Sequence, residues 1–119
     1  MGLFFVLTNL PDRASADALA QVLVEGRFAA CVNILPPCRS IYRWNGAIEA
    51  ANEVPMLIKT TEARYAALEA AIRAQHPYDV PEIIAVPVAA ALPVYLAWVV
   101  AETEEPNGKD IGKETGLSV

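Results

Sequence analysis

The spacing of apolar residues changes several times along the chain, and each change marks a predicted element. Residues 3–8 form a short apolar run, which predicts a strand buried on both faces. The next apolar residues follow a helical period: Ala16, Leu19, Ala20 and Leu23. Asp12 precedes them as a predicted N-cap, and Gly26 follows them as a predicted stop. The chain therefore begins with a strand, a turn at residues 9–12 and a helix.

The middle of the chain predicts a long β-hairpin. Residues 28–35 predict a second strand, and residues 40–44 an extended segment. Asn45-Gly46 predicts a two-residue type I′ turn, because both residues tolerate a positive φ. Residues 47–61 then return antiparallel, and Pro55 indicates an edge or a bulge. This register pairs Trp44 with Ala47, Arg43 with Ile48 and Tyr42 with Glu49. Neither face of the hairpin is purely apolar, so we expect it to project and pack on another chain.

Three further elements follow the hairpin. Thr61 is the predicted cap of a second helix, which ends where His76 precedes Pro77. Its predicted buried stripe is Tyr65, Leu68 and Ile72. Residues 82–88 predict a last strand and residues 92–102 a final helix with Pro93 in its first turn. That helix is apolar on nearly all sides, which indicates contact with another subunit.

The predicted order β-α-β-β-α-β is that of an α+β, ferredoxin-like fold, also called split βαβ. It places an antiparallel sheet under helices that lie on one face, with the long hairpin and the C-terminal helix added. The other sheet face is left bare. Oligomerisation is the simplest way to cover it.

Length and charge restrict the possible partners. The 119 residues allow one domain, and the net charge is −5. Residues 103–119 form a predicted acidic tail outside the domain of residues 1–102. No cluster of lysine and arginine exists to bind phosphates, so we expect neither nucleic acid nor a membrane surface as partner. Prolines and flanking acids argue against a membrane span in residues 83–101.

The two cysteines and the single histidine have two interpretations each. Two thiols do not form the disulfide framework of a secreted protein, so we expect a cytoplasmic protein. Cys31 is either a buried apolar residue or a nucleophile with His76 as its base. His76 is either a structural hydrogen-bonding residue at a helix end or a metal ligand. No phosphate-binding glycine loop, nucleophile elbow or H-E-x-x-H motif is present, so the sequence predicts no enzyme.

A lysine, two carboxylates and three aromatic residues form a second candidate site. Lys59 is the only lysine before residue 109, and it could anchor an anionic ligand. The predicted cleft between subunits consists of Tyr42, Trp44, Glu49, Lys59, Tyr78 and Glu82. Packing of the aromatic residues at a subunit interface is the structural alternative.

Several separated motifs resemble the CutA divalent-cation tolerance family. They are ACVNI at 30–34, IYRWNG at 41–46 with IE at 48–49, IKT at 58–60, HPY at 76–78 with VPEI at 80–83, and Tyr95, Leu96 and Trp98. The resemblance covers residues 3–101. It implies a ferredoxin-like subunit in a homotrimer, with the hairpin and the C-terminal elements at subunit contacts, and a non-catalytic protein implicated in tolerance of divalent metal ions.

The same resemblance bears on metal binding. Copper has been attributed to some members, through a cysteine and two consecutive histidines whose positions hold Thr8, Gln75 and His76 in this chain. Only His76 carries over, so it is the one predicted metal ligand, and any binding of copper is expected to be weak. No cofactor is required. The alternatives are a PII-like small-molecule sensor with ligand clefts between subunits, suggested by fold analogy alone, and an enzyme that uses Cys31 and His76.

Overall fold

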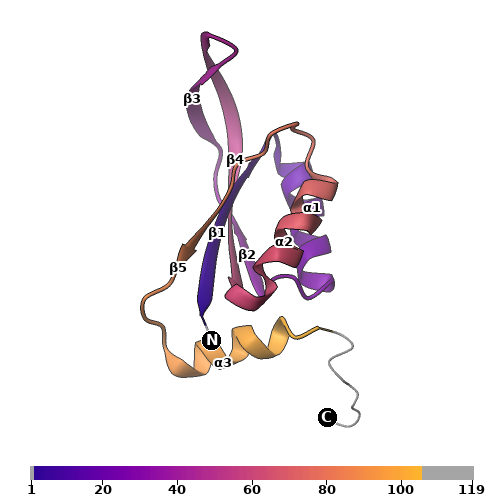
Figure 1. The fold of residues 1–119 in the computed structure, drawn as a ribbon. Coiled ribbons are helices and arrows are strands. Elements are labelled where there is room, and N and C mark those ends of the chain that lie inside the picture. The colour runs from indigo at the N-terminus through magenta and orange to yellow at the C-terminus, as the bar shows by residue number, and fades with distance from the viewer. Residues whose placement is uncertain (1, 106–119) are drawn as a thin grey trace.

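An antiparallel sheet with two helices on one face makes up most of the molecule, and a third helix lies across one end of the sheet (Figure 1). The structure is a computed structural model that describes residues 2–105. The predicted tail, apart from residues 103–105, lies outside the described residues. No helix within residues 2–105 is long and apolar enough to cross a membrane.

The elements follow in the predicted order. The strands are β1 (Leu3–Leu10), β2 (Cys31–Ile34), β3 (Cys38–Trp44), β4 (Ala47–Thr61) and β5 (Ile83–Pro87), and the helices are α1 (Arg13–Glu25), the 3₁₀ turn η1 (Glu62–Arg64), α2 (Tyr65–Gln75) and α3 (Pro93–Glu102).

The long strand β4 organises the sheet. The strand order is β2-β4-β1-β5, and all of these pairs are antiparallel. The first half of β4 pairs with β3, from Trp44 opposite Ala47 to Cys38 opposite Glu53, so the predicted hairpin register is confirmed. Asn45 and Gly46 both have positive φ, as the predicted turn requires. The hairpin projects well beyond the helices (Figure 1).

The core lies between the sheet and the α1–α2 layer. Alternate residues of β1 and β4 point into it, because side chains change face at every step along a strand. Val6, Met56 and Ile58 are fully buried there. The helices contribute Ala16, Leu19, Leu23, Leu68 and Ile72. The predicted stripes of both helices are thus largely confirmed, with Tyr65 and Ala20 partly buried at the margin.

The opposite face of the same sheet is only partly covered by this chain. Phe5 and Leu7 of β1 are half-buried, and Ile84 and Val86 of β5 are 50% and 53% exposed. At one end of this face a small cluster of Leu3, Ala30 and Val99 anchors α3. We call the rest of this side of the sheet, which includes Phe5, Leu7, Ile84 and Val86, the open face. The prediction that residues 3–8 are buried on both faces is therefore wrong for the single chain.

The second strand is shorter than predicted, because the chain turns before it enters the sheet. Gly26 caps α1, but the left-handed residue is its neighbour Arg27, with φ of 61°. The amides of Phe28 and Ala29 both donate to the carbonyl of Leu23 and not to a strand. These backbone bonds keep residues 28 and 29 out of the sheet, and the amide of Ala30 is the first to donate to β4, at the carbonyl of Lys59.

Two local predictions in the second half need correction. Pro55 does not lie in an edge strand, and of the two predicted alternatives the register fits the bulge, because residues 35–37 stand opposite only residues 54 and 55. It lies in the central strand β4, where the pairing of β4 passes from Cys38 opposite Glu53 to Ile34 opposite Met56. Thr61 does cap the next helical segment, but that segment begins with the 3₁₀ turn and becomes α-helical only at Tyr65.

Candidate functional site

His76 lies at the end of α2, and both of its ring nitrogens contact backbone. Nε2 lies 2.7 Å from the carbonyl oxygen of Asn9, and the amide of Tyr78 donates to Nδ1 across 3.2 Å. An amide donor needs an unprotonated Nδ1, so Nε2 carries the proton and donates to Asn9. The ring therefore joins the end of β1 to the segment that leads into β5. Both nitrogens are engaged.

Tyr78 extends this network to the base of the hairpin. Its hydroxyl donates to Oε2 of Glu53 across 3.1 Å, and its ring lies 4.8 Å from that of His76. Burial, followed by the hydrogen bond and the charge of Glu53, raises the pKa of Tyr78 to about 12. Nearby, Nδ2 of Asn9 donates to Glu82 across 3.2 Å. The network connects β1, β4 and the loop before β5.

The residues at the family's attributed copper positions do not reproduce the ligand set attributed to that site. Thr8 is fully buried, and its hydroxyl is the one buried side-chain polar atom without a partner in the part of the chain that the structure describes. It supplies a neutral oxygen where a soft metal prefers a thiolate. Gln75 is exposed, and His76 could bind a metal at Nδ1 only after releasing Tyr78. Across residues 2–105, no three His, Cys, Asp or Glu side chains are grouped to hold a metal.

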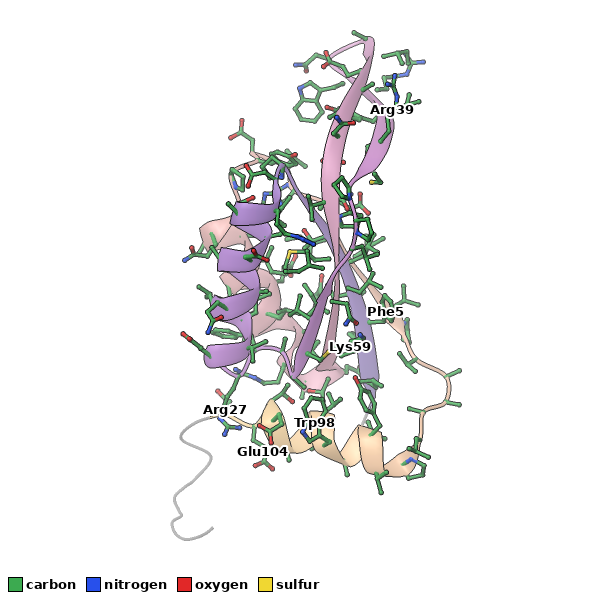
Figure 2. All side chains as sticks on the ribbon, turned by 180° about the vertical axis from the view of Figure 1, so that it is seen from behind. Phe5, Arg27, Arg39, Lys59, Trp98 and Glu104 are labelled. Carbon is green, nitrogen blue, oxygen red and sulfur yellow. The ribbon has the colours of Figure 1, made fainter. Side chains whose placement is uncertain are left out.

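Lys59 and Cys31 meet on the open face. The ammonium of Lys59 donates to the side-chain oxygen of Asn33, and it lies 4.0 Å from the sulfur of Cys31. Cys31 is half-buried. His76 lies near the opposite end of the sheet, where its ring is hydrogen-bonded to backbone. Lys59 and Phe5 lie on the sheet above α3, which carries Trp98 (Figure 2). Burial, and to a smaller extent Cys31, raises the pKa of the adjacent Tyr95.

The six residues of the predicted cleft do not meet within one chain. Tyr42, Trp44 and Glu49 lie on the projecting hairpin, whereas Tyr78 and Glu82 lie near its base. Lys59 is ten residues beyond Glu49 on the same strand, a distance of roughly 33 Å at ~3.3 Å per residue. A cleft that contains all six therefore needs residues from more than one subunit, and it stays a prediction.

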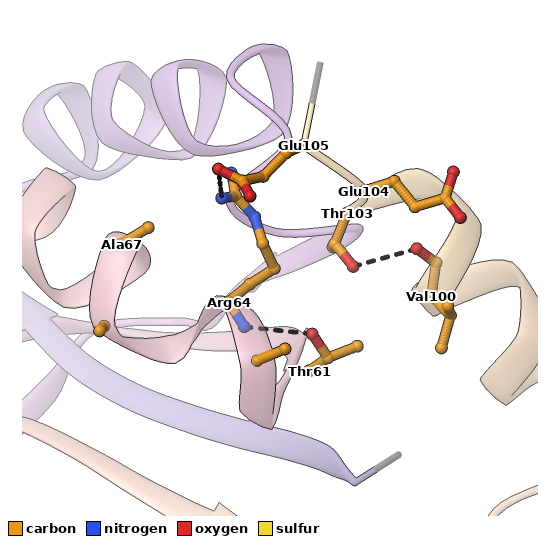
Figure 3. Close-up of a pocket in the computed structure, with 9 residues that line it drawn as sticks. Thr61, Arg64, Ala67, Val100, Thr103, Glu104 and Glu105 are labelled. Atoms are coloured by element: carbon orange, nitrogen blue, oxygen red, sulfur yellow. Dashed lines mark hydrogen bonds and ion pairs between the residues drawn. The ribbon is translucent and has the colours of Figure 1, made fainter. Parts of the chain in front are cut away.

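A pocket that the sequence did not indicate lies between the start of α2 and the end of α3. Its volume is about 430 Å³, and Ala63, Ala66 and Ala67 line one side while Val100, Glu104 and Glu105 line the other (Figure 3). Arg64 crosses its edge and lies 3.8 Å from Glu105. Alanines at positions 63, 66 and 67 recur at helical spacing, but that pattern alone does not show that α3 returns to face them.

The chain belongs to the CutA1 divalent ion tolerance protein family. Residues 4–102 match the model of that family, which covers every element from β1 to α3. The resemblance inferred from the separated motifs is thereby confirmed.

Relatives share most of this chain. The divalent-cation tolerance protein CutA of Pectobacterium atrosepticum is 45% identical over 93 residues, which are 78% of this chain and 84% of that protein. The human protein CutA is 46% identical over 94 residues, 79% of this chain and 52% of that protein. The solved divalent cation tolerance protein of Thermus thermophilus superposes with a TM-score of 0.84 at 42% identity, over 86% of this chain and 99% of that one. CutA1 from Oryza sativa gives 0.85 at 35% identity, over 88% and 96%.

Proposed function

We propose that this chain is a non-catalytic, homotrimeric CutA protein that takes part in tolerance of divalent metal ions and binds cations such as copper weakly. The observation that carries the weak binding is the pair of hydrogen bonds on His76, because a metal must displace one of them. Binding at Nδ1 frees the amide of Tyr78, and that loss is subtracted from the energy of the metal bond. The family names of the relatives support the tolerance role.

Exposed apolar residues on three parts of the molecule support the trimer. They occur on the hairpin, on the open face and on α3, and the largest are Ile41, Tyr42, Trp44, Ile48, Ile84, Val86, Leu92, Val94 and Trp98. Monomeric proteins rarely expose large apolar patches, so clusters of such residues favour a subunit interface. The strand order with two helices on one face further supports the ferredoxin-like topology of such subunits.

The assembly is tested by the mass in solution. We expect about 38 kDa, three times the chain mass of 12.8 kDa. Ile48→Lys on the hairpin should lower this mass towards that of one chain, whereas Val80→Lys should not. Both residues are highly exposed in the single chain, 63% and 70%, so neither change should unfold it. A wild-type protein that has the mass of one chain at micromolar concentration would disprove the trimer.

Metal binding is tested by calorimetric titration of Cu²⁺ and Zn²⁺ into the wild type and His76→Asn. The expected result for the wild type is weak binding that is lost in the variant. Gln75→Ala is the matched control, since Gln75 is the exposed neighbour of His76 at the helix end. Identical isotherms for the wild type and His76→Asn would show that His76 is not a ligand.

We also propose a reducing, cytoplasmic location and no enzymatic activity. Cys31 and Cys38 are both free thiols, which supports a reducing compartment. A reactive Cys31 would need an available base, and the imidazole of His76 is engaged with Asn9 and Tyr78. Alkylation of the native protein tests this point: Cys38 should be labelled quickly and Cys31 slowly. Rapid labelling of Cys31 would contradict the proposal.

A further inference from the structure

The pocket between α2 and α3 combines methyl groups with carboxylates. Ala63, Ala66 and Ala67 supply methyl groups from the first turns of the α2 segment, and Val100 supplies two more from α3. Glu104 and Glu105 line the same pocket. Figure 3 shows these side chains around the space between the two elements. An occupant that complements this lining is a small aliphatic side chain with cationic groups beside it.

The carboxylates of the pocket are only lightly neutralised. Arg64 lies 3.8 Å from Glu105, but its Nε and Nη2 donate to the carbonyl of Arg27, at 3.3 and 3.2 Å. Its guanidinium also lies over the ring of Phe28, 5.2 Å from the centroid. These contacts hold Arg64 towards the α1–β2 loop. Within residues 2–105, no cation forms an ion pair with Glu104.

The sequence that follows the last described residue has the complementary pattern. Residues 109–113 are Lys-Asp-Ile-Gly-Lys, so Ile111 has a lysine two positions away on either side. In an extended segment, residues two apart lie on the same side. Lys109, Ile111 and Lys113 would therefore present one aliphatic side chain between two ammonium groups.

The connection to the pocket is short enough. Glu105 itself lines the pocket, and Ile111 is six positions further along the chain, a span of at most roughly 20 Å. Pro106-Asn107-Gly108 lies between them, a composition typical of tight turns. A turn at these three residues would allow residues 109–113 to reach the pocket.

We propose that residues 109–113 bind in this pocket, with Ile111 against Ala63, Ala66, Ala67 and Val100 and with Lys109 and Lys113 beside Glu104 and Glu105. The occupant is thus a segment of the same chain. Because the linker is short, its effective concentration at the pocket is high, and a few contacts suffice. The segment covers Ala63 of η1 with Ala66 and Ala67 of α2, and ties the end of α3 to the start of α2.

Methyl NMR on the full-length protein tests the proposal. With labelled alanine and isoleucine methyl groups, we expect nuclear Overhauser effects between the δ1 methyl of Ile111 and the β methyls of Ala66 and Ala67. Ile111→Asp should abolish these effects and shift the resonances of Ala63, Ala66 and Ala67. Leu117→Asp is the matched control, because it introduces the same charge outside the five-residue pattern, and it should leave them unchanged.

Charge-reversal variants, added salt and dilution test the proposed contacts further. Lys109→Glu with Lys113→Glu should weaken the Overhauser effects, and raising the salt concentration in the wild type should do the same because the contacts are exposed. Identical alanine resonances in the wild type and Ile111→Asp would overturn the proposal. Resonances that revert on tenfold dilution would also overturn it, since the occupant would then belong to another copy of the chain.

Discussion

The two faces of the central sheet are formed by the same strands but differ in how deeply their side chains are buried. On one face Val6, Met56 and Ile58 are fully buried under α1 and α2. On the other, Phe5 and Leu7 are half-buried and Ile84 is half-exposed. Both faces carry apolar residues, with Lys59 and Asn33 among those of the open face, but α1 and α2 cover only one of them. The difference shows that the fold of one chain buries only one face of its sheet, and we propose that another subunit covers the other.

The strongest test of this comparison replaces one isoleucine on each face by lysine. Ile58→Lys places an unpaired charge in a fully buried position, which costs several kcal/mol and should unfold a domain whose total stability is about 5–15 kcal/mol. Ile84→Lys, at 50% exposure, should leave the chain folded and separate the subunits. Circular dichroism and mass in solution distinguish the outcomes. An Ile84→Lys protein that remains trimeric would show that the open face is not the interface.

The His76 network marks the edge of the covered face, and its removal should have the next largest effect. His76→Ala removes hydrogen bonds to Asn9 and to the amide of Tyr78, so the free energy of unfolding should fall by about 2 kcal/mol. Gln75→Ala, one residue earlier and exposed, should change it by less than about 0.5 kcal/mol. Urea denaturation measures both. Equal effects of the two substitutions would exclude a structural role for the imidazole.

Tyr78 gives a pH-dependent test of the same edge. Tyr78→Phe removes the bond to Glu53 and should lower the free energy of unfolding by about 1 kcal/mol at neutral pH. The folded-state pKa of Tyr78 is raised from 10.0 to about 12, so the neutral phenol is favoured in the native state. Its stabilisation is complete below pH 10 and is lost as the pH rises towards 12. The difference between wild type and Tyr78→Phe should shrink over that range. A constant difference would contradict the assignment.

The smallest expected effect concerns the buried hydroxyl on the covered face. Thr8 is fully buried and its Oγ1 has no partner, which costs free energy in the native state. Thr8→Val replaces the hydroxyl by a methyl group of similar size and should raise the free energy of unfolding by up to about 1 kcal/mol. Thermal unfolding measures the change. Destabilisation by this substitution would show that a water satisfies the hydroxyl.

Local chemistry explains which parts of the fold were predictable from sequence. The hairpin register was predicted pair by pair, because Asn45-Gly46 defines the turn and the turn defines the pairing. The cap of Thr61 and the buried stripe of α2 follow from neighbouring residues in the same way. The start of β2 was not predictable, since it depends on bonds from residues 28 and 29 back to Leu23 across a left-handed Arg27.

The candidate site was less predictable than the fold. The sequence marks His76 as unique, but the partners of its ring are backbone atoms of Asn9 and Tyr78, and backbone groups have no sequence signature. The pairing of Lys59 with Asn33 and Cys31 likewise depends on the register between β2 and β4. The pocket at Ala63, Ala66 and Ala67 exists only because α3 ends beside them.

The sequence by itself determined the order of the elements and the hairpin turn, because periodicity, capping and turn chemistry act between residues close in the chain. It also indicated the family, through the resemblance of several separated motifs. Tertiary structure alone decided which apolar face is covered, which atoms engage His76 and where a pocket forms. These depend on contacts between segments far apart in sequence, such as β1 with the loop after α2, or α2 with α3. Such contacts arise from packing the whole chain, so no local pattern records them.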